Sequence, residues 1–137
     1  EFRRVLFRSN SYFLEDAFQK ENQIQFEIRV KGNVQGLRID PAFYPCMVKF
    51  KELRINGTSV SLEKRKLLAV NGKLLKDAEK TAIYRPSMLF STFDPNIYLD
   101  LTKLELKEDN TVSVNLEIVR LSEEMAKDME TAVKKIL

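Results

Sequence analysis

Three aspartates are the side chains whose type and spacing offer acid–base chemistry: Asp40, Asp94 and Asp100. Two carboxylates flanking a cleft can hydrolyse a glycosidic bond, one acting as general acid and the other as base or nucleophile. Asp40 and Asp94 each precede a proline, and aspartate in this position commonly starts a turn by bonding to its own backbone. We therefore favour the turn interpretation and predict no catalytic residue.

Cys46 is the only cysteine, and the chain contains no histidine. A cysteine nucleophile lacks its usual base here, and the common zinc sites require several cysteine or histidine ligands. Cys46 falls on the apolar phase of a predicted strand, which indicates a buried structural residue. The four glycines lack the spacing of a phosphate-binding loop. We therefore predict neither a metal nor a cofactor.

Tyr44 is the best candidate for ligand binding, because the chain has no tryptophan and only four tyrosines. It lies in the loop 41–45, between two prolines, where its ring could be presented to a sugar. A loop aromatic can also cap the edge of the core, and this alternative stays open. Asn56-Gly57-Thr58 matches the N-glycosylation pattern, but an Asn-Gly pair between strands favours a tight turn.

The first nine residues do not fit a targeting segment. A signal peptide needs an apolar run of about 7 to 15 residues, whereas Val5 to Phe7 is the whole run here. The stretch back-translates to GAG TTC AGA CGT GTG CTC TTC CGA TCT, which resembles a short-read sequencing adapter. We therefore interpret residues 1–9 as a scar that is not part of the fold, and we expect the natural protein to extend beyond both ends of this metagenomic fragment.

The charge balance argues against a nucleic-acid partner. The chain has 23 basic and 20 acidic residues, and leaving out residues 1–9 reduces these to 20 and 19, a net charge of +1. A nucleic-acid-binding surface normally needs a clear basic excess. No apolar run approaches the roughly 18 residues of a membrane span, so we predict one domain without membrane insertion and a cytoplasmic location.

Apolar and polar residues alternate strictly in several segments, which is typical of half-buried strands. The clearest segments are 23–30 and 112–118. Shorter apolar runs predict further strands at 37–39, 46–50, 53–55, 68–70, 74–75, 82–84, 88–90 and 97–101. Many short strands without an intervening helix indicate an all-β fold, an antiparallel two-sheet sandwich or jelly roll, over residues 10–121.

Two local features refine this prediction. The apolar residues occupy even positions up to Phe50 and odd positions from Leu53, so the strand should bulge near Lys51 and Glu52. Asn56-Gly57 and Asn71-Gly72 each predict the turn of a β-hairpin.

The period becomes helical from Ser122, which predicts a C-terminal helix over 122–137 with Ser122 as its N-cap. The helix carries an apolar seam with heptad-like spacing, formed by Met125, Met129, Ala132 and Ile136. This seam could pack on the helix's own domain, begin a linker to another domain, or pair with a second helix in an oligomer.

Two stretches resemble a known family. LRIDPAFYPCMVKFKELRING, residues 37–57, and FSTFDPNIYLDL, residues 90–101, are similar to segments of the β-sandwich accessory domains of some bacterial glycosyltransferases that build cell-surface polysaccharides. The similarity covers most of residues 12–137, with isoleucine at Ile39 where the family usually has phenylalanine. The family's sandwich resembles carbohydrate-binding modules and is commonly followed by a helical or coiled-coil linker, which would begin at Ser122.

The resemblance implies a noncatalytic accessory domain that binds a glycan or orients neighbouring domains of the same chain. It transfers no catalytic residue. The alternative is a structural or oligomerisation module that binds no sugar and associates through the helical seam.

Overall fold

The computed structural model describes residues 4–7, 11–13, 18–20, 22–62, 68–75 and 86–136. The predicted strand at 82–84 lies outside these residues. The elements in chain order are β1 (Arg4–Phe7), β2 (Ser11–Phe13), β3 (Phe18–Lys20), β4 (Gln23–Lys31), β5 (Gly36–Asp40), β6 (Cys46–Ile55), β7 (Thr58–Ser59), β8 (Leu68–Val70), β9 (Lys73–Leu75), β10 (Ser87–Phe90), β11 (Ile97–Asp100), the 3₁₀ helix η1 (Leu101–Lys103), β12 (Asp109–Arg120) and α1 (Glu123–Ile136).

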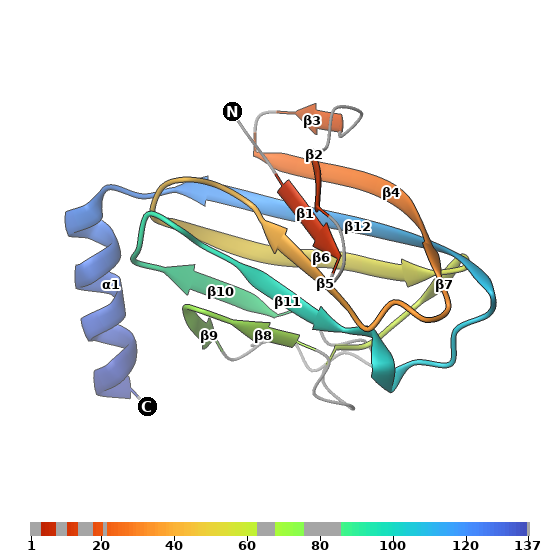
Figure 1. The fold of residues 1–137 in the computed structure, drawn as a ribbon. Helices are drawn as coiled ribbons and strands as arrows, with labels where there is room; N and C mark the ends of the chain where they lie inside the picture. Colours follow the sequence, from red (N-terminus) through yellow and green to blue (C-terminus); the bar gives the residue numbers. More distant parts are fainter. Residues whose placement is uncertain are drawn as a thin grey trace.

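The described strands form two antiparallel sheets, as the alternation predicts. The first sheet has the order β2-β1-β5-β11-β8, and the second has the order β3-β4-β12-β6-β10-β9, with β7 paired to β6. Figure 1 shows β5 and β11 in front of β6 and β12, with α1 at one end of the molecule. The fold is therefore mostly β with one C-terminal helix, and this part of the prediction is confirmed.

One cluster of buried side chains joins the inner faces of the two sheets. The first sheet contributes Leu37 and Ile97, and the second contributes Phe50 and Leu116. From Asp109 to Val119 of β12 the burial alternates strictly, because successive side chains point to opposite faces of a strand. Each fully buried aliphatic or aromatic side chain stabilises the fold by about 1.5–3 kcal/mol. The other face of each half-buried strand is left for polar residues.

The predicted bulge is present in β6. Leu116 of β12 pairs with Phe50, and the residue before it on β12, Asn115, pairs with Glu52. Lys51 is therefore the extra residue of β6. The bulge keeps Leu53 on the buried face together with Phe50, which a regular strand would not allow at this spacing.

The two Asn-Gly pairs have different roles. Asn56 and Gly57 have φ angles of 52° and 83° and connect β6 to its partner β7, so the hairpin prediction is confirmed here. The hairpin prediction at Asn71-Gly72 is wrong, since β8 pairs with β11 in one sheet and β9 pairs with β10 in the other. The chain crosses between the sheets there, where a Cβ on Gly72 would lie 2.3 Å from the Leu89 carbonyl oxygen.

Helix α1 begins where the sequence predicts, because the Ser122 hydroxyl accepts a hydrogen bond of 3.1 Å from the Met125 amide. The helix packs on the outer face of the seven-stranded sheet, at its β9–β10 end. Ala126, Met129 and Val133 of the helix belong to the same cluster as Leu89 of β10. The helix therefore covers one end of this outer face, and the other end remains open.

Residues 4–7 belong to the segment predicted to lie outside the fold, yet they pair with β5 as β1. β1 lies between β2 and β5, and strand pairing uses backbone groups that every chain carries. The origin of residues 1–9 and the domain boundaries at 10 and 122 therefore stay predictions. No helix among the described residues is both long enough and apolar enough to cross a membrane.

Candidate functional site

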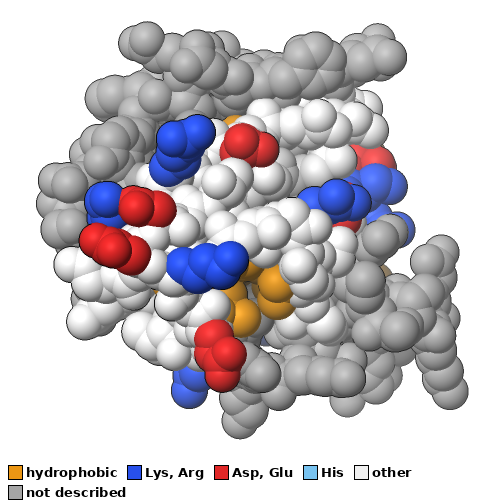
Figure 2. Space-filling view, turned by 90° about the vertical axis from the view of Figure 1, so that its right-hand side faces the viewer, with side chains coloured by type: hydrophobic (Ala, Val, Ile, Leu, Met, Phe, Trp, Pro, Cys, Tyr) orange, Lys and Arg blue, Asp and Glu red, His pale blue; other side chains and the backbone are white. Residues whose placement is uncertain are grey.

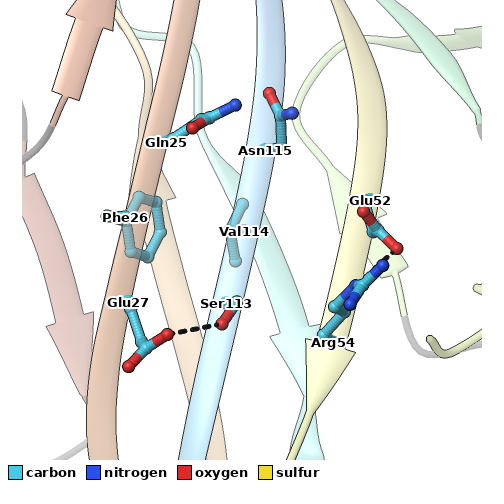
Figure 3. A pocket seen from close by; sticks show the side chains of 8 residues that line it. All are labelled: Gln25, Phe26, Glu27, Glu52, Arg54, Ser113, Val114 and Asn115. Atoms are coloured by element: carbon cyan, nitrogen blue, oxygen red, sulfur yellow. Dashed lines mark hydrogen bonds and ion pairs between the residues drawn. The ribbon is translucent and has the colours of Figure 1, made fainter. Parts of the chain in front are cut away.

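A shallow pocket of about 380 Å³ lies on the open part of the outer face of the seven-stranded sheet (Figure 3). Three neighbouring strands, β4, β12 and β6, form its floor. The lining residues are Gln25, Phe26, Glu27, Glu52, Arg54, Ser113, Val114 and Asn115. Its volume is at the low end of the range for small-molecule sites, about 300–1,000 Å³.

The strand register arranges the six polar lining residues in two rows across the sheet. Ser113 lies between Glu27 and Arg54, and the next outward residue of β12, Asn115, lies between its partners on β4 and β6, Gln25 and Glu52. Strand spacing makes this grid about 10 Å wide and about 7 Å along the strands. The pocket therefore presents a compact, planar set of hydrogen-bonding groups.

Each of the strands β4, β12 and β6 supplies one column of this grid, and the bulge at Lys51 determines which residues of β6 belong to it. Because Lys51 is the extra residue, Glu52 and Arg54 both lie opposite outward-facing residues of β12. A bulge also bends its strand and increases the local twist. We attribute the hollow in the sheet to this irregularity, which occurs beside Asn115.

Several hydrogen bonds hold the wall of the pocket on β6. Arg54 Nε donates to Glu52 Oε1 at 2.7 Å, and the Ser59 hydroxyl donates to the same oxygen at 2.6 Å. Arg54 and Glu52 therefore form an ion pair within the wall. Such a pair is pre-organised, since each side chain restricts the other.

The opposite side of the pocket is less constrained. Glu27 is exposed, and its Oε2 accepts a hydrogen bond of 3.2 Å from the Ser113 hydroxyl. In the described part of the chain, Asn115 Oδ1 is a buried acceptor without a hydrogen-bond partner. An unpaired buried acceptor costs about 1–3 kcal/mol. A donor bound in the pocket would remove this cost only if the Asn115 amide turned its oxygen outward.

Tyr44 lies away from this pocket. Its ring is half-buried, packs against the core and lies 4.4 Å from the Arg120 guanidinium carbon. Arg120 is five residues beyond Asn115 on β12, a distance of about 16 Å along the strand. The cation covers one face of the ring. The ligand-binding role of Tyr44 stays a prediction, and it concerns a location separate from this pocket.

Two of the three aspartates, Asp40 and Asp100, have a local side-chain partner. Asp40 is 1% exposed and its Oδ1 accepts a hydrogen bond of 2.9 Å from Arg38 Nε. Asp100 caps η1 by accepting from the Thr102 amide at 3.0 Å. Asp94 is exposed. The register places Asp40 and Asp100 at opposite ends of the β5–β11 pair, about 13 Å apart along the strands.

Cys46 is buried in the core, and burial raises the pKa of its thiol to about 12. The neutral thiol is therefore favoured, as expected for a small apolar core residue. Among the described residues, no group of three or more carboxylate, thiol or imidazole side chains could hold a metal ion.

Sequence reasoning missed the pocket, although a signal for it exists. The outward positions of β4, β12 and β6 near their midpoints are occupied by amide, carboxylate, hydroxyl and guanidinium groups rather than by lysine alone. Sequence does not show which of these strands are neighbours. The strand order, with β12 between β4 and β6, brings them together.

The end of the molecule opposite α1 carries interspersed basic and acidic side chains around a small apolar area (Figure 2). Neither sign of charge dominates this view.

Comparison of the chain with protein-family models, with curated proteins and with solved structures finds no match.

Proposed function

We propose that this chain is a noncatalytic carbohydrate-binding accessory domain, and that the pocket over β4, β12 and β6 is its sugar site. The two-row grid of polar side chains is the observation that carries the proposal. Sugars expose many hydroxyl groups at fixed spacing, and planar amide, carboxylate and guanidinium groups recognise them through paired hydrogen bonds. The area of the grid matches one or two sugar rings.

The fold supports the same proposal. We infer that the two sheets pack as a β-sandwich of the jelly-roll type, an architecture that recurs in lectin-like domains. The open outer face then serves for binding, whereas α1 covers the opposite end of that face. A shallow site of this size would bind weakly, and attachment to an enzyme would raise the effective affinity.

The wider context follows from the resemblance of residues 37–57 and 90–101. We propose that the domain belongs to a multidomain bacterial glycosyltransferase that acts in the cytoplasm on cell-surface polysaccharide. Neighbouring domains of the same chain would be its partners, and α1 would lead toward them.

Titration of the ¹⁵N-labelled domain with a panel of bacterial oligosaccharides tests the proposed site. We expect amide shifts centred on Ser113 and Asn115, and Asn115→Ala should weaken binding by about tenfold, since a hydrogen bond is worth about 1 kcal/mol or slightly more. Thr111→Ala is the matched control, because Thr111 is on the same face of β12 outside the pocket lining. If the amide shifts are confined to the Tyr44 loop, the sugar binds at that loop and not in the pocket.

A structural or oligomerisation module is the second candidate. Met125 is 52% exposed and Ala132, seven residues later on α1, is also exposed. Met129 of the predicted seam packs on the domain's own sheet instead. If the exposed residues pair with a second helix, the double variant Met125→Glu, Ala132→Glu should lower the mass measured by light scattering to that of a monomer. Lys127→Glu, exposed on the same helix, is the control.

A further inference from the structure

The pocket carries more negative than positive charge. Two carboxylates and one guanidinium line it. The guanidinium of Arg54 is engaged by Glu52, whose Oε1 also receives the Ser59 hydroxyl. The wall on β6 is therefore electrically neutral.

Glu27 is the remaining charge. It is exposed, forms no ion pair in the described part of the chain, and accepts only the 3.2 Å hydrogen bond from Ser113. Figure 3 shows its carboxylate beside Ser113 at the edge of the pocket. Among the described residues, the other cations on this face, such as Arg29 and Lys51, lie outside the lining. Arg29 is two residues, about 7 Å, farther along β4, and Lys51 is paired with Glu117 at 3.5 Å.

Asn115 lies on the central strand of the pocket, between Gln25 and Glu52. Its Oδ1 has no partner in the described part of the chain and lies in the row next to Glu27. A ligand placed over Glu27 therefore meets a carboxylate that has one hydrogen bond, from Ser113, and no ion pair in the described part of the chain. An ammonium group offers three donors and a positive charge, whereas a second carboxylate offers neither.

We propose that the pocket selects a sugar that carries a free amine, and that Glu27 is the residue that recognises it. This inference rests on the proposed function. An exposed charge pair changes a binding affinity by only a modest factor. We therefore expect the amino sugar to bind about threefold more tightly than its neutral N-acetyl counterpart. A uronic acid of the same ring size, repelled by Glu27, binds about threefold more weakly than the neutral sugar.

Three methyl glycosides test the proposal on the complete 137-residue chain: those of glucosamine, N-acetylglucosamine and glucuronic acid. Titrations at about pH 6 keep the amine protonated and the uronic carboxyl ionised. The amide shifts of Ser113 and Asn115 report binding. Glu27→Gln should remove the preference for the amine without removing binding. Glu105→Gln, which neutralises an exposed residue outside the pocket, should leave the order unchanged.

The outcomes separate the two proposals. If none of the three glycosides shifts the pocket amides, the carbohydrate site itself is refuted, and the amine preference with it. If they bind with equal affinity, if the uronic acid binds most tightly, or if Glu27→Gln keeps the preference, the carbohydrate site stands and the role of Glu27 is refuted.

Discussion

The side-chain amide of Asn56 donates a hydrogen bond of 3.0 Å to Asn110 Oδ1, and this bond joins two residues that are 54 positions apart in the chain. Asn110 is buried, and its side chain also bonds to both backbone groups of Lys107. Asn56 Oδ1 accepts from the Thr111 amide at 2.9 Å. The two asparagines therefore fasten the β6–β7 turn to the start of β12. Both atoms of the Asn56 amide are engaged, which supports the turn interpretation of Asn56-Gly57-Thr58.

Asn110→Ala should lower the free energy of unfolding by about 2–4 kcal/mol, because it removes a buried side chain and leaves several partly buried donors and acceptors unpaired. Urea unfolding followed by circular dichroism measures the change. Asn33→Ala, at an exposed turn position, should change stability by less than about 0.5 kcal/mol. Equal effects of the two variants would show that the Asn56–Asn110 link does not stabilise the fold.

Asp40→Ala should destabilise the domain by about 2–3 kcal/mol. The substitution removes a buried carboxylate and leaves the Arg38 guanidinium without this partner. Because Arg38 keeps access to water, the cost falls below that of a fully buried pair. Asp94→Ala, at an exposed position, is the control and should have little effect. A double-mutant cycle with Arg38→Ala isolates the pair, and an interaction energy near zero would contradict the prediction.

The thiol of Cys46 makes the free energy of unfolding depend on pH under alkaline conditions. Burial raises its folded-state pKa from 9.0 to about 12. The unfolded chain therefore loses the proton first, so stability present below pH 9.0 is lost as the pH rises toward about 12. The loss amounts to about 4 kcal/mol at most.

Cys46→Ala should remove this component of the pH dependence while lowering stability at neutral pH through the smaller side chain. Unfolding midpoints at several pH values between neutral and alkaline conditions measure both effects. The same burial predicts that a thiol reagent labels Cys46 in urea and not in the native protein at neutral pH. Rapid labelling of the native protein would contradict the buried position.

Deletion of Lys51 should leave the domain folded, with a stability change of about 1–2 kcal/mol. Lys51 is the extra residue of the bulge, so its removal restores a regular ladder and keeps Leu53 on the buried face. Deletion of Leu53 instead moves Arg54 to a core position and should prevent folding. Circular dichroism and urea unfolding compare the two deletions. Unfolding of the Lys51 deletion would contradict the bulge assignment.

The sequence by itself determined the strands β4 to β6 and β8 to β12, the bulge and the start of the helix, whereas β1, β2, β3 and β7 were not predicted. Each depends on contacts between residues close in the chain: the change of phase between Phe50 and Leu53, or the Ser122 hydroxyl over the first turn of α1. Periodicity reports such local geometry directly, since the face of a strand or helix is fixed by spacing.

Only the tertiary structure decided which strands are neighbours, and the candidate site depends on that order. Asn71-Gly72 has the letters of a hairpin, yet β8 and β9 belong to different sheets because β11 and β10 provide their partners. Likewise Gln25, Glu52 and Asn115 are polar positions on three strands whose adjacency no local pattern encodes. Pairing between distant strands is settled by burial of the whole core, so the pocket becomes visible only in the folded chain.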